Sequence, residues 1–202
     1  PVGEGLAGVT QDALAPGQSF TYRFVAPQAG TFWYHSHQVS HEQVVGGLYG
    51  ALVIEQKDGE PPADAVAMAH TYTGVRTING KPENLAVRAM PGATTRVRVV
   101  NTDNAPLPVW ASAPVVVEAI DGNDVNQPSP VSGQVIRVAA GGRVDRLVTP
   151  PASGGVRIQL SKATAVVVSA GGAEPAEPEQ PSARFDPLTY GTPADPGFDP
   201  TR

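Results

Sequence analysis

The sequence predicts an all-β protein built from Greek-key β-sandwiches, and three observations support this fold class. Valine, threonine and isoleucine recur in short runs, without the three- to four-residue spacing of an amphipathic helix. Glycine and proline are abundant, at 22 and 21 of the 202 residues. Turn-forming residues separate the runs at regular intervals, which is the pattern of a β-sandwich.

The first three expected strands lie at residues 19–25, 31–37 and 49–55. The first alternates polar with aromatic residues, and the third is an apolar run interrupted by glycine. The polar stretch between the second and third strands fits either a loop or a short helix. Because a sandwich needs about seven strands, we expect residues 1–57 to be part of a domain whose N-terminal strands are missing.

A second domain is expected after a short linker. Residues 58–63 (DGEPPA) have the composition of a linker, and residues 64–170 of a complete second sandwich. Residues 171–202, rich in proline and glutamate, are expected to form an extended linker or tail. The strands expected in the second domain are 65–72, 94–102 (with Arg96 and Arg98 on one face), 115–120, 134–138, 143–148, 156–160 and 164–169.

Charge and composition argue against several functional classes. The net charge is only −5, and no stripe of basic and aromatic residues suggests nucleic-acid binding. No apolar run approaches the roughly 20 residues that cross a bilayer. The sequence has no cysteine, so it holds no disulfide, no thiolate metal site and no nucleophilic thiol. No signal peptide is recognisable, and because the sequence starts at Pro1 this leaves the location of the native protein open.

Three of the four histidines, His35, His37 and His41, lie within seven positions. On a strand, His35 and His37 would project from one face with their Cα atoms roughly 6.5–7 Å apart. That spacing suits two imidazoles that reach one metal ion or two adjacent ions. By itself it also suits ordinary solvated histidines.

The sequence motifs around this pair resemble those of a known family. GTFWYHSH followed by GLYGALVIE, and GLAGVTQDALAPGQSFTYRF before them, resemble the first domain of the multicopper oxidases. TINGKPEN, PGATTRVRVVNT, AIDGNDVNQPSPV and VAAGGRVDRLV resemble, in this order, the middle domain of the same family. The resemblance implies cupredoxin-like sandwiches, one partial and one complete, from a laccase-like enzyme with three such domains.

The resemblance also implies a function. His35 and His37 would each ligate one of the paired type 3 coppers, and imidazole suits copper. A type 1 copper needs a thiolate, so this chain cannot hold that site. The parent would oxidise a small reducing substrate and reduce O₂ to water, together with N-terminal strands and a third domain that this sequence lacks. It would be secreted or in the cell envelope, and this chain alone would be inactive.

Two alternatives stay open. One is a non-catalytic cupredoxin-like module for binding or scaffolding. The other is a trimeric two-domain oxidase, which would need a cysteine motif in its second domain.

The remaining candidate residues are expected to support the site or the fold. His41 and Glu42 are expected at the surface or beside the metal ligands, and His70 as an ordinary polar residue that binds no metal. One of Trp33 and Tyr34 should pack in the core while the other screens the metal face. Asn101 and Asp121 are expected turn formers.

Overall fold

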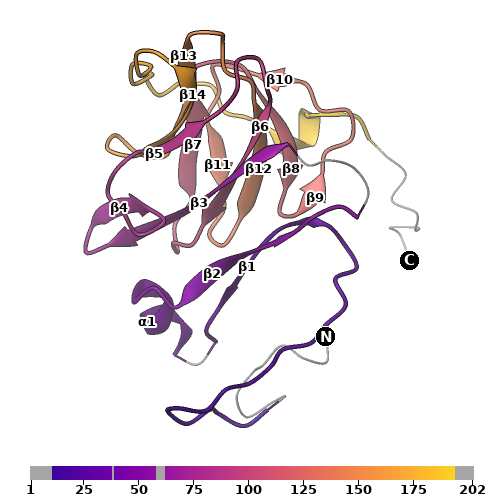
Figure 1. Cartoon of the computed structure of the whole chain (residues 1–202), viewed down its shortest axis with the longest axis vertical. Helices are drawn as coiled ribbons and strands as arrows, with labels where there is room; N and C mark the ends of the chain where they lie inside the picture. Colours follow the sequence, from indigo (N-terminus) through magenta and orange to yellow (C-terminus); the bar gives the residue numbers. More distant parts are fainter. Residues whose placement is uncertain (1–10, 38, 58–61, 194–202) are drawn as a thin grey trace.

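The computed structural model describes residues 11–37, 39–57 and 62–193 and confirms the all-β fold class. Two β-sheets pack face to face, and a two-stranded hairpin and an extended N-terminal segment lie below them (Figure 1). Residues 58–61 of the expected linker and 194–202 of the expected tail lie outside the described residues, as do residues 1–10. No helix within the described part of the chain has the length and hydrophobicity to cross a membrane.

The two sheets form a sandwich with crossed connections. The larger sheet has the order β10-β8-β12-β6-β3-β4, with β9 also paired to β8, and the smaller has the order β11-β7-β13-β14-β5. Consecutive strands often belong to different sheets, as in a Greek key. The larger sheet contains β3 (Ala63–Tyr72), β4 (Val75–Ile78), β6 (Thr95–Asn101), β8 (Val115–Ile120), β9 (Asn123–Asp124), β10 (Pro130–Val131) and β12 (Arg143–Val148). The smaller sheet contains β5 (Leu85–Arg88), β7 (Leu107–Ala111), β11 (Ile136–Val138), β13 (Gly154–Gln159) and β14 (Ala165–Gly171).

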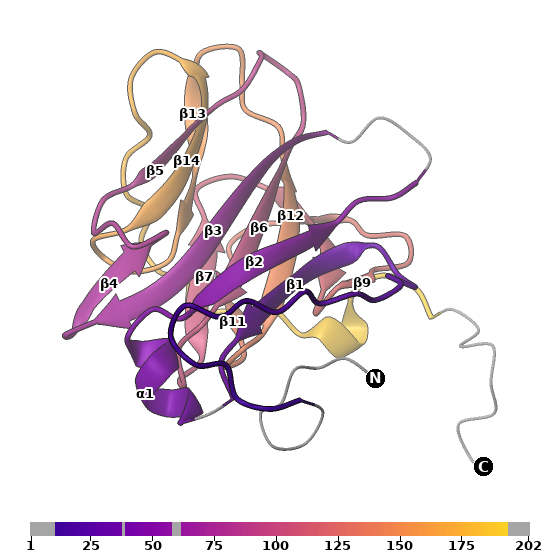
Figure 2. The ribbon, with the colours of Figure 1, turned by 60° about the horizontal axis from the view of Figure 1, so that its bottom comes forward.

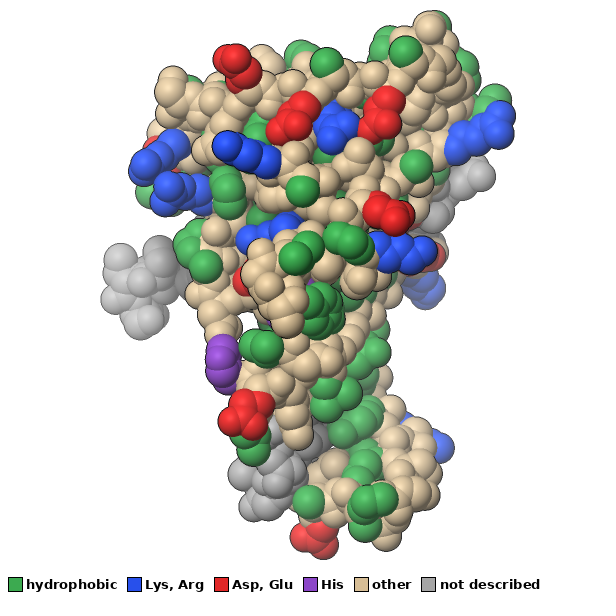
Figure 3. Space-filling model, turned by 90° about the vertical axis from the view of Figure 1, so that its left-hand side faces the viewer, with side chains coloured by type: hydrophobic (Ala, Val, Ile, Leu, Met, Phe, Trp, Pro, Cys, Tyr) green, Lys and Arg blue, Asp and Glu red, His purple; other side chains and the backbone are tan. Residues whose placement is uncertain are grey.

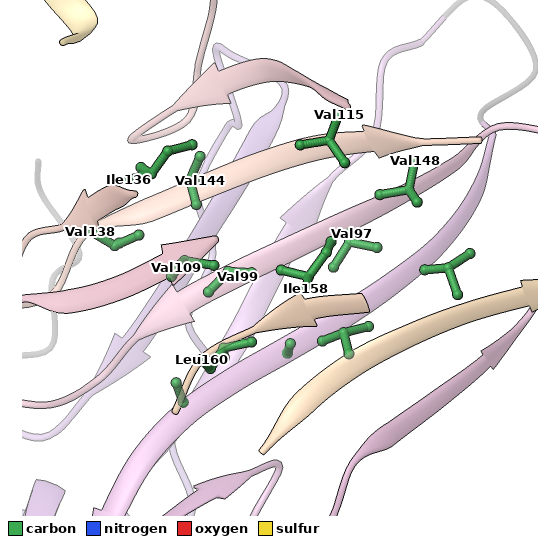
Figure 4. Close-up of a cluster of buried hydrophobic side chains, with 14 of the residues drawn as sticks. Val97, Val99, Val109, Val115, Ile136, Val138, Val144, Val148, Ile158 and Leu160 are labelled. Carbon is green, nitrogen blue, oxygen red and sulfur yellow. The ribbon is translucent and has the colours of Figure 1, made fainter. Parts of the chain in front are cut away.

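Branched aliphatic side chains fill the space between these sheets (Figure 4). Val97 and Val99 of β6 are fully buried there, in the same cluster as Ile158 of β13. Because side chains alternate along a strand, Arg96 and Arg98 of β6 project together from the outer face, as the sequence predicts.

A hairpin of β1 (Gly30–His35) and β2 (Tyr49–Ile54) lies across that outer face, over β6 and β12 (Figure 2). The polar stretch between its strands forms the short helix α1 (Ser40–Val45), so the helix alternative holds rather than the loop. β1 ends at His35, two residues earlier than predicted, and His37 therefore lies beyond the strand.

The prediction of a strand at residues 19–25 is wrong. The segment is described, but no described strand pairs with it, and a strand needs a hydrogen-bonded neighbour. Its alternation leaves large side chains on the surface, with Phe24 63 % and Val25 88 % exposed. Hydrophobic side chains accordingly gather on the lower part of the molecule in Figure 3.

A buried ionic network fastens the hairpin to the sandwich. Thr31 of β1 is fully buried, and its hydroxyl donates to both carboxylate oxygens of Asp145, at 2.8 and 2.7 Å. Arg98 donates from Nη1 to the Thr31 hydroxyl and to Asp145, at 2.7 and 2.9 Å, and from Nε to Asp64 at 2.7 Å. One side chain of the hairpin thus completes an ion pair that belongs to the sandwich.

Stability should depend on pH through Asp145. Burial raises the pKa of this carboxyl above its ordinary value of 3.8, although Thr31 and Arg98 act in the opposite direction. A carboxyl with a raised pKa holds its proton more tightly in the folded chain, so its titration removes stability as pH rises from that ordinary value through the raised one. Asp145→Asn cannot titrate. We therefore expect the free energy of unfolding of the unmodified chain, relative to Asp145→Asn, to fall as pH rises over this window.

Urea unfolding of both proteins at a series of pH values measures this difference. A difference that stays constant, or that grows in favour of the unmodified chain as pH rises, would contradict it.

The segment after residue 170 packs on the sandwich as far as it is described. Trp110 donates from Nε1 to the carbonyl of Pro178, and Phe185 packs against the hydrophobic core. The hydroxyl of Tyr190 donates to the Ser129 carbonyl. The segment also forms the 3₁₀-helix η1 (Pro187–Thr189). Its prolines prevent regular strand pairing but still allow side chains to anchor it.

Candidate metal centre

The two candidate ligands lie together at the end of β1. His35 is the last residue of the strand, where it pairs with Tyr49 of β2, and His37 follows two residues later. Their rings stack with centroids 4.6 Å apart and an angle of 27° between the planes. His37 is exposed, and His35 is half-buried. Both rings therefore lie on one side of the hairpin, within reach of solvent.

The proton position on His35 follows from its neighbour. Nδ1 lies 3.0 Å from the backbone carbonyl oxygen of Ser36. A carbonyl can only accept, so Nδ1 must carry the proton and donate it. In the neutral ring the lone pair is then on Nε2, the nitrogen available to a metal ion.

His35 is held on both faces. Trp33 stacks on it with centroids 4.3 Å apart and 24° between the planes, and His37 stacks as well. Tyr34 is 63 % exposed and its ring covers Gly50, which leaves no room for a side chain there. Trp33, not Tyr34, is thus the aromatic residue beside the histidines.

The donor set suits copper. Two imidazoles are good ligands for copper, and a backbone acceptor already fixes one of them in the right tautomer. Within the described residues, no group of three or more His, Cys, Asp or Glu side chains is placed to hold a metal ion. The segment thus offers two imidazole donors.

The other polar residues of the same segment have different partners. His41 is an exposed residue of α1, and its Nδ1 accepts from the amide nitrogen of Asn104 at 2.8 Å. Glu42 is exposed on α1. The hydroxyl of Ser36, between the two histidines, donates to Gln43 and so links the loop to the helix.

His70 lies elsewhere, buried in β3, and is only 2 % exposed. The hydroxyl of Thr102 donates to the Ala69 carbonyl, so Nδ1 of His70 donates to that hydroxyl, at 2.9 Å. The same nitrogen lies 3.2 Å from Oδ1 of Asp103. The other carboxylate oxygen of Asp103 forms an ion pair with Arg76. His70 is therefore a polar residue, as predicted, but one that is built into the sandwich rather than placed at its surface.

Tyr49 separates His70 from the histidine pair. Its ring lies 5.1 Å from that of His70 and 6.4 Å from that of Trp33. Its hydroxyl is 3.0 Å from that of Tyr72. Burial, and then this hydrogen bond, raise the pKa of Tyr49 above its ordinary value, so Tyr49 remains a protonated phenol at neutral pH.

One contact that the sequence does not indicate joins Trp33 of the hairpin to the sandwich. Nε1 of Trp33 donates to the carbonyl oxygen of Gly141 at 3.1 Å. Gly141 is 108 residues away and contributes only backbone, so no pattern of side chains in the sequence could have indicated it.

Comparisons with known proteins cover the segment that contains the two candidate ligands. Residues 1–59 match the family model of the multicopper oxidases. A multicopper oxidase of Talaromyces pinophilus is 51 % identical over 61 residues, which are 30 % of this chain and 10 % of the relative. Laccase-1 of Botryotinia fuckeliana is 31 % identical over 129 residues, which are 49 % of this chain and 22 % of the relative.

The fold is similar to solved structures over nearly the whole chain. The crystal structure of a multi-copper oxidase from Pseudomonas thermotolerans aligns with a TM-score of 0.72 and 25 % identity, covering 95 % of this chain and 52 % of that one. This chain thus spans a small part of the two sequence relatives and about half of the structural one. The fold of the sandwich is cupredoxin-like, as expected.

Proposed function

We infer that this chain is part of a multicopper oxidase, and we propose that His35 and His37 are the copper ligands that this part contributes. The observation that carries the proposal is the stacked pair of imidazoles at the end of β1, with the lone pair of His35 on Nε2. The pair lies within the residues that match the family model.

Each ring would hold one copper of a type 3 pair. Copper bound here would supply one-electron chemistry and a binding place for O₂. The chain's own residues do something simpler: His35 and His37 present nitrogen donors, and Ser36 fixes the tautomer of His35 through its carbonyl oxygen.

The parent protein, in this proposal, oxidises a small reducing substrate and reduces O₂ to water. The sequence has no cysteine, so a type 1 copper would have to be bound by other parts of the protein. The comparisons give no support to a non-catalytic cupredoxin-like module. Secretion or a place in the cell envelope is proposed on the resemblance alone.

We propose the same division of the chain as the sequence suggests. Residues 1–57 would belong to the first domain, 58–63 to a linker, 64–170 to the second domain and 171–202 to a segment that leads to a third. Other parts of the same protein would then complete the metal centre beside the hairpin.

Calorimetric titration of the purified chain with Cu²⁺ tests the site. We expect weak binding that both His35→Ala and His37→Ala reduce by more than the roughly 10–100-fold that loss of a supporting residue costs. His41→Ala is the matched control, because this histidine is exposed four positions after His37 and has a different partner. His70→Ala should likewise leave binding unchanged. If His35→Ala and His37→Ala both bind Cu²⁺ like the unmodified chain, these histidines are not the ligands.

A further inference from the structure

One side chain, Trp33, contacts both the sandwich and the candidate ligand His35. Trp33 stacks on the imidazole with centroids 4.3 Å apart, and its indole nitrogen donates to Gly141 of the turn before β12. Trp33 is half-buried between the two. The plane of the His35 ring is therefore set on one face by a side chain that the sandwich holds.

The turn that accepts this hydrogen bond is well supported. Gly141 has φ +71°, in the left-handed region that favours glycine, and its N–H donates to the Asn101 carbonyl at 2.9 Å. Gly142 donates to the Ala139 carbonyl at 2.9 Å, which closes the turn. Arg143 also donates to the Gly141 carbonyl, at 3.3 Å. Three hydrogen bonds, donated by Gly141, Gly142 and Arg143, thus fix the turn that carries the acceptor of Trp33.

The indole ring also lies close to this turn. A Cβ atom on Gly141 would lie 3.4 Å from Cζ2 of Trp33, at ordinary van der Waals contact. The hydrogen bond from the indole nitrogen to Gly141 restricts rotation of the ring. The imidazole that stacks on it loses the corresponding freedom.

We propose that Trp33 is a positioning residue, through which the turn at Gly141 fixes the ring of His35 and raises its affinity for copper. The proposal rests on the proposed function of His35. The reason is the general one for metal sites: a ligand that is already oriented binds more tightly than one that must be ordered, and losing an orienting partner typically weakens binding about 10–100-fold.

Two variants of Trp33 separate the stacking on His35 from the hydrogen bond to Gly141. Trp33→Phe keeps an aromatic face for His35 but removes the donor to Gly141, and Trp33→Leu removes both. We expect Cu²⁺ affinity, measured by calorimetry, to fall about 10–100-fold in Trp33→Leu and by a smaller factor in Trp33→Phe. Tyr34→Leu is the matched control, since it removes the adjacent aromatic ring, which does not face His35, and it should leave the affinity unchanged.

A spectroscopic measurement distinguishes positioning from general destabilisation. Electron paramagnetic resonance of bound Cu²⁺ should show one nitrogen-ligated species in the unmodified chain and in Tyr34→Leu, and several in Trp33→Leu. Unchanged affinity and an unchanged spectrum in Trp33→Leu would overturn the proposal. If Trp33→Leu fails to fold, Trp33→Phe decides by the same two measurements.

A different result would contradict the proposed function of His35 itself. In that case His35→Ala would bind Cu²⁺ like the unmodified chain, whatever the Trp33 variants do. If His35→Ala loses binding and the Trp33 variants do not, the ligand assignment stands and only the positioning role is wrong.

Discussion

Replacing Arg98 with methionine is expected to lower the free energy of unfolding by about 3–5 kcal/mol. The guanidinium is only 2 % exposed and binds Asp145, Asp64 and the Thr31 hydroxyl. Methionine fills a similar volume but leaves the buried carboxylate of Asp145 without its cation. Removing one partner of a buried ion pair costs more than the pair contributes, because the remaining charge stays desolvated.

Urea unfolding measures the effect, with Arg96→Met as the control. Arg96 lies two residues earlier on the same face of β6 and pairs with Glu118, but both side chains are about one-fifth exposed. Its loss should cost about 1 kcal/mol or less, as for pairs near the surface. Equal effects of the two variants would show that burial of the Arg98 network does not determine its contribution.

Replacing Asn101 with alanine is expected to cost about 3–4 kcal/mol, because its side chain satisfies several buried backbone groups at once. The residue is fully buried at the end of β6. Its amide nitrogen donates to the carbonyls of Ala105, Val138 and Ala139, and its amide oxygen accepts from the backbone N–H of Asp103. Alanine removes all four hydrogen bonds, and of the three carbonyls Ala139 keeps its bond from Gly142.

The same unfolding measurement applies, with Asn104→Ala as the control. Asn104 is exposed, and its change should stay within about 0.5 kcal/mol. An effect of Asn101→Ala below about 1 kcal/mol would mean that water can replace the side chain. The sequence predicted Asn101 as a turn former, whereas the structure places it as the last residue of β6.

The sequence predicted most of the second sandwich because its strands carry their own signal. The runs of β6, β12 and β14 are mostly buried, and a glycine or asparagine lies at or next to one end of each. β7 was missed because Pro108 interrupts a five-residue strand, and proline argues against a strand inside a sheet. β4 and β5, with four residues each, are too short for a pattern to be distinguished from a turn.

The candidate site was only partly predictable for a related reason. The pair His35 and His37 is local, so spacing and surrounding residues were sufficient to select it. Its geometry is not local, because Trp33 is anchored to a carbonyl more than a hundred residues away. The same reasoning explains the wrong strand at residues 19–25, where alternation indicates strand propensity but says nothing about whether a neighbouring strand is present.

The attachment of the hairpin has a dynamic consequence. Among the described residues, no backbone-to-backbone hydrogen bond joins β1 or β2 to the sandwich; the connections are side chains such as Thr31, Trp33 and Arg143. A two-stranded hairpin is marginally stable by itself. It can therefore lift away as one unit without opening a sheet, and its amide protons should exchange with solvent through that local opening, before those of β6 and β12. The candidate ligands His35 and His37 thus lie on a part of the chain that opens more easily than β6 and β12, and a copper ion bound there would protect the hairpin amides.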